Sequence, residues 1–149
     1  MNRVILPILR FSNHVIKHEM SGIESSATTF PGSISMCEKL RPQVVILMGN
    51  GGFRALLTRA LALARAEVPW LHATHVNADG ILDGTDKLGT PVGPAQFVEG
   101  ASVVLAHFLG LLVNFIGAAL TLGMVRDVWP EVPVNDSDFF VEGLYEKAK

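Results

Sequence analysis

The chain has 149 residues and a formal net charge of −2, which fits one domain with a hydrophobic core and gives no dominant basic region for nucleic acid. Hydrophobic residues make up 49% and charged residues 17%, below the ~25% usual in soluble domains, so much of the chain is buried, touches lipid or mediates assembly. A single cysteine, Cys37, excludes an intrachain disulfide framework and fits a reducing compartment.

The first segment, residues 1–20, is predicted to form a helix. Its apolar residues recur at helical spacing, and Pro7 is tolerable in a first turn. Residues 21–33 are rich in Ser, Thr, Gly and Pro and predict a flexible linker. We therefore expect the first helix to dock loosely, or onto another chain.

Residues 34–130 are predicted to form a helical core domain. Ser35 and Glu38 match a capping box, and Pro42 predicts a kink or a helix restart. A break is expected at 49–52, followed by an amphipathic helix from Phe53 to Val68. The predicted buried face of this helix comprises Phe53, Leu56, Leu57, Ala60, Leu61, Ala64 and Val68.

The rest of the core domain combines a short hairpin-like insertion with a long helix. His72 to Val76 reads as a strand, and Ile81-Leu82 is expected to pair back onto it. A helix from about Ala95 to Val128 follows. The acidic tail, 131–149, is expected to be extended unless Phe139 and Phe140 pin it down.

The long helix contains residues 100–125, a run without Asp, Glu, Lys or Arg. At 1.5 Å per residue such a run reaches about 39 Å, which exceeds the ~30 Å hydrocarbon core of a bilayer. Ser102, Ala106 and Gly110 have the small-xxx-small spacing that suits helix contact in lipid. A membrane span is therefore one reading of the run.

A soluble core helix is the favoured reading. The flanks, Glu99 and Arg126-Asp127, lack the Lys/Arg cluster that sets membrane topology. The apolar face of Phe53–Val68 also needs a partner helix. Weakly polar residues recur at 3-4-3-4 spacing and predict one stripe, read as an intrachain packing seam or as an interface between two copies. The stripe comprises His107, Gly110, Asn114, Gly117 and Thr121.

The Gly-rich segment 49–54 follows an apolar run and precedes an amphipathic helix, as a dinucleotide-binding turn does. G-x-G-x-x-G would require Gly at position 54, which is Arg, and the Lys-Ser/Thr of a P-loop is missing. A Gly-rich turn between helices, with Gly49 and Asn50 as caps, is the favoured interpretation. The weak anion-site candidates are Asn50, Gly51, Gly52 and Arg54.

Four histidines are weak metal-ligand candidates: His14 and His18 at i, i+4, and His72 and His75. No carboxylate or cysteine joins them at a recognised spacing, so no metal site is predicted. The sequence also predicts no catalytic residue and no cofactor.

Whole phrases of the chain, CEKLRP from Cys37, GNGGFRALLTRALALA from Gly49, EVPWL from Glu67 and LGLLVNFIG from Leu109, carry a resemblance. Over roughly residues 37–138 the chain resembles a family of short bacterial helical proteins of unknown function. The resemblance implies a cytoplasmic helical protein and no particular activity or site. Ala118 and Gly123 stand where such relatives carry charges.

The expected fold is all-α, a bundle of about four helices around a long hydrophobic C-terminal helix. The expected function is that of a non-enzymatic interaction or regulatory protein in the cytoplasm, acting as a homo-oligomer or with a protein partner, without nucleic acid. The alternatives are a small inner-membrane protein anchored by residues 100–125 and a nucleotide- or anion-binding protein using residues 49–54.

Overall fold

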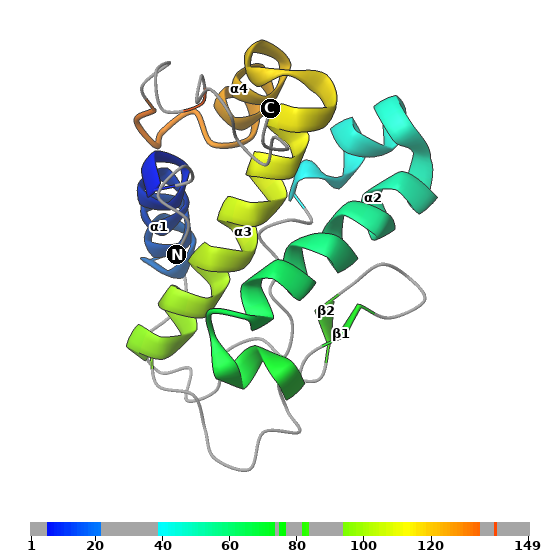
Figure 1. Ribbon diagram of the computed structural model, residues 1–149. Helices are drawn as coiled ribbons and strands as arrows, with labels where there is room; N and C mark the ends of the chain where they lie inside the picture. Colours follow the sequence, from blue (N-terminus) through cyan, green and yellow to red (C-terminus); the bar gives the residue numbers. More distant parts are fainter. Residues whose placement is uncertain are drawn as a thin grey trace, which may run out of the picture.

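A computed structural model describes residues 6–21, 39–73, 75–76, 82–83, 94–134 and 139, which form an all-α bundle around one central helix (Figure 1). This confirms the predicted fold class. The four α-helices of the described residues are α1 Leu6–Ser21, α2 Arg41–Arg65, α3 Pro94–Ile116 and α4 Ala118–Val128.

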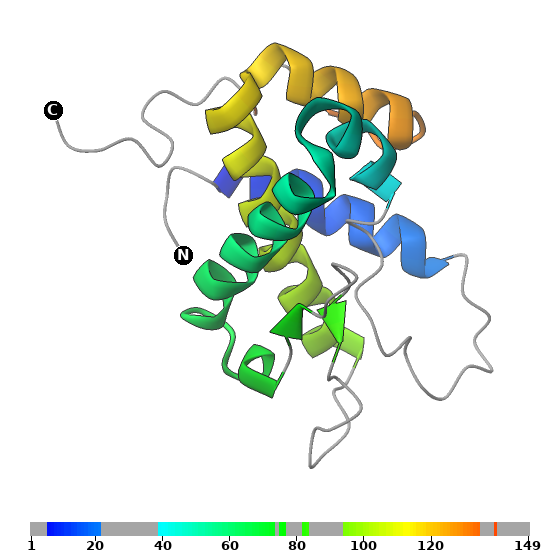
Figure 2. The same ribbon diagram turned by 90° about the vertical axis from the view of Figure 1, so that its right-hand side faces the viewer.

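Helix α3 is the centre of the bundle. Every residue from Gly100 to Leu112 is buried. Helices α1 and α2 pack along two sides of α3, and α4 folds back over its carboxyl end (Figures 1 and 2). A helix that is apolar on all faces needs neighbours on all faces, and the other three helices supply them here.

The predicted continuous helix from Ala95 to Val128 is wrong, because the chain turns sharply at Gly117. This residue has φ 92° and ψ 160°, a region open almost only to glycine. The N–H of Gly117 donates to the Val113 carbonyl at 2.9 Å, which closes α3. The Thr121 hydroxyl donates to the Gly117 carbonyl at 2.9 Å and supports the first turn of α4. The uncharged run is thus divided between two helices.

Helix α2 also bends at a glycine. Pro42 lies in the first turn of α2, where a missing N–H costs no hydrogen bond, so no kink occurs at Pro42. Whether a helix precedes it, as the capping box predicts, lies outside the described residues. The break predicted at 49–52 falls on Gly49, which has φ 77° and ψ 172°. The Arg41 guanidinium lies 4.3 Å from the centroid of the Phe53 ring, so a cation–π contact joins the two segments across the bend.

The segment of α2 after the bend carries the buried face predicted for it. All seven predicted apolar residues are buried, and Phe53 packs against Phe108 of α3 with ring centroids 5.4 Å apart. The helix ends at Arg65 rather than Val68, and a 3-10 helix, η3 (Pro69–Ala73), follows. The Arg65 Nε donates to the Leu71 carbonyl at 3.3 Å and ties η3 to α2.

The predicted hairpin-like insertion is present as a minimal antiparallel pair. Strand β1 (His75–Val76) pairs with β2 (Leu82–Asp83), His75 opposite Asp83 and Val76 opposite Leu82. The strand predicted from His72 is shorter, because η3 extends to Ala73.

Helix α1 belongs to the same core as α3. Its face of Ile8, Phe11, Val15 and Ile16 is buried. Phe11 packs edge-on against the rings of Trp129 and Phe139, at 6.5 and 5.6 Å between centroids. Phe139 therefore contacts the core, which is the exception that the sequence analysis allowed for an otherwise extended tail. The linker beyond Ser21, the capping box at Ser35 and Glu38, Cys37 and Phe140 lie outside the described residues.

Candidate functional site

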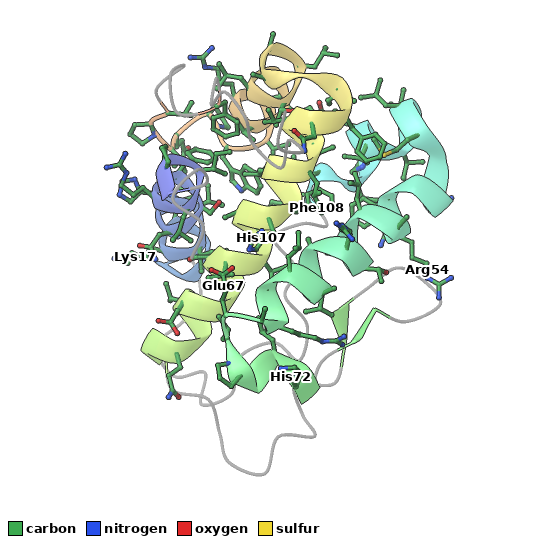
Figure 3. All side chains as sticks on the ribbon, in the orientation of Figure 1. Lys17, Arg54, Glu67, His72, His107 and Phe108 are labelled. Atoms are coloured by element: carbon green, nitrogen blue, oxygen red, sulfur yellow. The ribbon has the colours of Figure 1, made fainter. Side chains whose placement is uncertain are left out.

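A buried histidine–carboxylate pair lies at the centre of the bundle. His107, in the middle of α3, is 3% exposed, and its Nε2 is 2.6 Å from Oε2 of Glu67, just after α2 (Figure 3). Burial raises the pKa of Glu67, but hydrogen bonds, the strongest of them with His107, and charge interactions together outweigh burial, so the pKa lies below its ordinary value of 4.5. Because an ionised carboxylate only accepts, His107 Nε2 donates.

The Glu67–His107 pair can fix the position of helices but has little access to a substrate. The ring is enclosed between α2 and α3, so a proton on it has no direct route to a molecule in solution. A hydrogen bond between an ionised group and a buried ring resists separation of its two helices more strongly than a neutral one. We therefore assign the pair a structural role, namely holding the end of α2 against α3.

A groove of about 610 Å³ runs between α1 and the first turns of α3. Its α1 wall carries Arg10, His14 and Lys17, all exposed. On the α3 wall stands one carboxylate, Glu99, and a hydrogen bond from Asn13 Nδ2 to Ser102 Oγ, 3.3 Å long, connects the walls. The groove has the size of a small-molecule site, typically ~300–1,000 Å³.

The large apolar residues that are exposed in the described part of the chain gather at one end of the molecule. Ile46 and Leu47, before the bend of α2, are 83% and 49% exposed. Phe115 and Leu120, on either side of the α3–α4 turn, are 70% and 56% exposed. Both views place the bend of α2 and the α3–α4 turn at the same, upper end (Figures 1 and 2). We call these four residues the apolar end.

The predicted interface stripe does not form one face, because the break at Gly117 separates its last member from the others. His107 and Gly110 are buried within α3, and Thr121 is buried on α4. Asn114 and Gly117 are exposed and lie beside Phe115 in the sequence, next to the apolar end. The interface role of the stripe remains a prediction.

The anion-site candidates Asn50, Gly51, Gly52 and Arg54 lie just after the bend of α2. Arg54 is exposed and extends away from the bundle (Figure 3). A Cβ on Gly52 would lie 2.6 Å from Met48 Cγ, so this glycine is required by a neighbouring side chain of its own helix. Packing thus accounts for Gly52 without a ligand.

The histidine candidates do not gather into a metal site within the described part of the chain. There, no group of three or more His, Cys, Asp or Glu residues is close enough to hold an ion. His14, His18 and His72 are exposed, and the structure does not describe the side chain of His75. His18 Nε2 instead lies 3.5 Å from Glu131 Oε2.

Sequence reasoning missed Glu67 and the groove. The sequence contains one indication of the Glu67–His107 pair. A buried histidine needs a polar partner, and Glu67 is the first carboxylate after Glu38, so few carboxylates in the core domain could serve. The groove was missed because α1 was expected to dock loosely.

No protein-family model, curated protein or solved structure matches the chain.

Proposed function

We propose that this protein is a non-enzymatic helical interaction protein of the cytoplasm that self-associates through the apolar end. The observation that carries the proposal is the exposure of Ile46, Leu47, Phe115 and Leu120 at one end of an otherwise well-buried bundle. Single exposed apolar residues are ordinary, whereas a group at one end marks a contact surface. The resemblance to a bacterial family of helical proteins is part of the same proposal.

Two properties of the apolar end favour protein association. Each half of it is set by a glycine bend, at Gly49 and at Gly117, so it belongs to fixed helices rather than to a loop. Asn114, a member of the predicted stripe, is exposed next to Phe115 and offers the polar contact that a mostly apolar interface needs at its rim.

The test is the oligomeric state of the full chain, measured by sedimentation velocity across a concentration series. The wild-type protein is expected to self-associate, and Phe115→Asp to weaken the association by roughly tenfold or more, because a charge would be desolvated at the contact. Ala62→Asp, at an exposed position on α2 after the bend, is the matched control and should leave the association unchanged. A wild-type chain that stays monomeric at every concentration contradicts the proposal.

A membrane-associated role is the second candidate. Within the described residues, α2 and the Val98–Ile116 part of α3 are long and apolar enough to span a bilayer. In α3, however, 72% of the most apolar 18-residue stretch is buried inside the protein. Crossing a bilayer would therefore require α3 to separate from the helices that pack against it. Sedimentation with vesicles of phosphatidylethanolamine and phosphatidylglycerol distinguishes the roles: the proposal predicts that the chain stays in the supernatant.

The nucleotide- or anion-binding alternative at residues 49–54 rests on the start of a helix and on Arg54. Among the described residues no second feature at that position points to a ligand. Phosphate titration followed by amide NMR tests it, and unchanged signals from Asn50 to Arg54 are the expected result.

A further inference from the structure

The groove between α1 and α3 has walls of unequal charge. Arg10, His14 and Lys17 follow each other at i, i+4 and i+7 and so form one row about 10 Å long on α1. Neither Arg10 nor Lys17 makes a hydrogen bond or ion pair with any residue that the structure describes. The α3 wall carries one carboxylate, Glu99, against the two formal positive charges of Arg10 and Lys17. The groove is therefore electropositive on balance.

The floor of the groove is apolar. Leu9 contributes from α1, and Val98 and Val103 contribute from α3. Asn13 donates one amide N–H to Ser102 Oγ, so these two polar groups are engaged with each other across the groove. A molecule that fits must place an apolar body on these three residues and a negative charge against the α1 wall.

We propose that this groove binds a free amphipathic carboxylate, a molecule with an aliphatic body and a single anionic head group. The head group lies against the α1 wall between Arg10 and Lys17, and the aliphatic body covers Val98 and Val103. Glu99 opposes binding by repulsion and selects against ligands that carry a second negative charge on the α3 side. This inference is independent of self-association at the apolar end.

The experiment is an NMR titration of the full chain with octanoate, followed on the backbone amides of 98–103 and on the side-chain amide of Asn13. Octanoate should shift these signals saturably. The alcohol of the same chain, 1-octanol, should bind several-fold more weakly because it lacks the charge, and inorganic phosphate should not saturate the signals because it lacks the apolar body.

Three charge variants test the direction in which each charge changes the octanoate affinity, and one further variant is the control. Lys17→Gln and Arg10→Gln should each weaken octanoate binding, and Glu99→Gln should tighten it, by roughly two- to fivefold each, as exposed charge pairs allow. Arg59→Gln removes an exposed arginine from α2 and should leave the affinity unchanged. Val98→Phe fills the floor and should abolish binding.

The inference is overturned if octanoate produces no saturable shift, or if 1-octanol or phosphate binds equally well. It is also overturned if Arg59→Gln weakens binding as much as Lys17→Gln, because the effect would then be one of net charge. All charge variants alter exposed side chains, so each is expected to fold, and the result does not depend on Val98→Phe.

Discussion

Glu67 and His107 form a hydrogen bond that joins the end of α2 to the middle of α3. Removing the charge of Glu67 leaves the buried ring with a neutral partner, so Glu67→Gln should destabilise the protein by about 1–3 kcal/mol near neutral pH. Thermal unfolding at pH 7 measures this. An unchanged melting temperature would mean that the 2.6 Å contact contributes nothing to the fold.

The same pair predicts how stability depends on pH. The pKa of Glu67 in the folded protein lies below its ordinary value of 4.5, so its contribution is complete above that value and is lost as the pH falls through the lower folded pKa. Wild-type protein should therefore lose more stability than Glu67→Gln on acidification below pH 4.5. Asp127→Asn, at an exposed carboxylate of α4, is the control and should follow the wild type. Parallel acid profiles for wild type and Glu67→Gln would disprove the linkage.

Two adjacent glycines of α2 should respond to alanine in opposite directions. A Cβ at Gly51 meets nothing within 4 Å, so Gly51→Ala should stabilise the helix by roughly 0.5–1 kcal/mol. A Cβ at Gly52 would lie 2.6 Å from Met48 Cγ and 2.8 Å from its Cβ, so Gly52→Ala should destabilise it. Denaturant unfolding of the two variants decides, and equal shifts would contradict the close approach of Met48.

At the scale of elements, the buried faces could be predicted and the bends could not. The spacing of Ile8, Phe11 and Val15 predicts the buried face of α1, and the spacing of the apolar residues from Phe53 to Ala64 predicts that of α2. An apolar face must be covered in any arrangement of the helices, so these predictions do not depend on the topology. Gly117 looked like one small residue among several in an apolar run. Its left-handed φ depends on α4 folding back onto the bundle, which local spacing does not encode.

The bend at Gly117 gives the prediction that belongs to this scale. Gly117→Ala forces a side chain into a backbone region that only glycine readily adopts, at a cost of about 1–3 kcal/mol, although the space around it is empty. Gly123→Ala, at an equally open but helical position of α4, should be stabilising. Unfolding free energies of the two variants test the bend. A neutral Gly117→Ala would mean that α3 and α4 can form one helix.

At the scale of the molecule, the other helices each cover part of α3, and the large apolar residues left exposed in the described part of the chain are those of the apolar end, on α2, α3 and α4. The sequence predicted a helical bundle because three amphipathic or apolar segments need common partners. It did not predict where the uncovered surface lies, because that depends on the two glycine bends. It also did not predict the groove, which exists only where α1 lies beside Val98 and Val103.

The central claim is that residues 101–112 are enclosed by other helices of the same chain. Hydrogen exchange of the full chain in buffer without detergent tests it most directly. Backbone amides alone exchange slowly in any stable helix, but only a helix in a cooperative core opens with the free energy of global unfolding. The account predicts that the amides of 101–112 exchange only through global unfolding and are the slowest in the protein. Amides in this segment that exchange early, or that gain protection only when detergent or lipid is added, would contradict it.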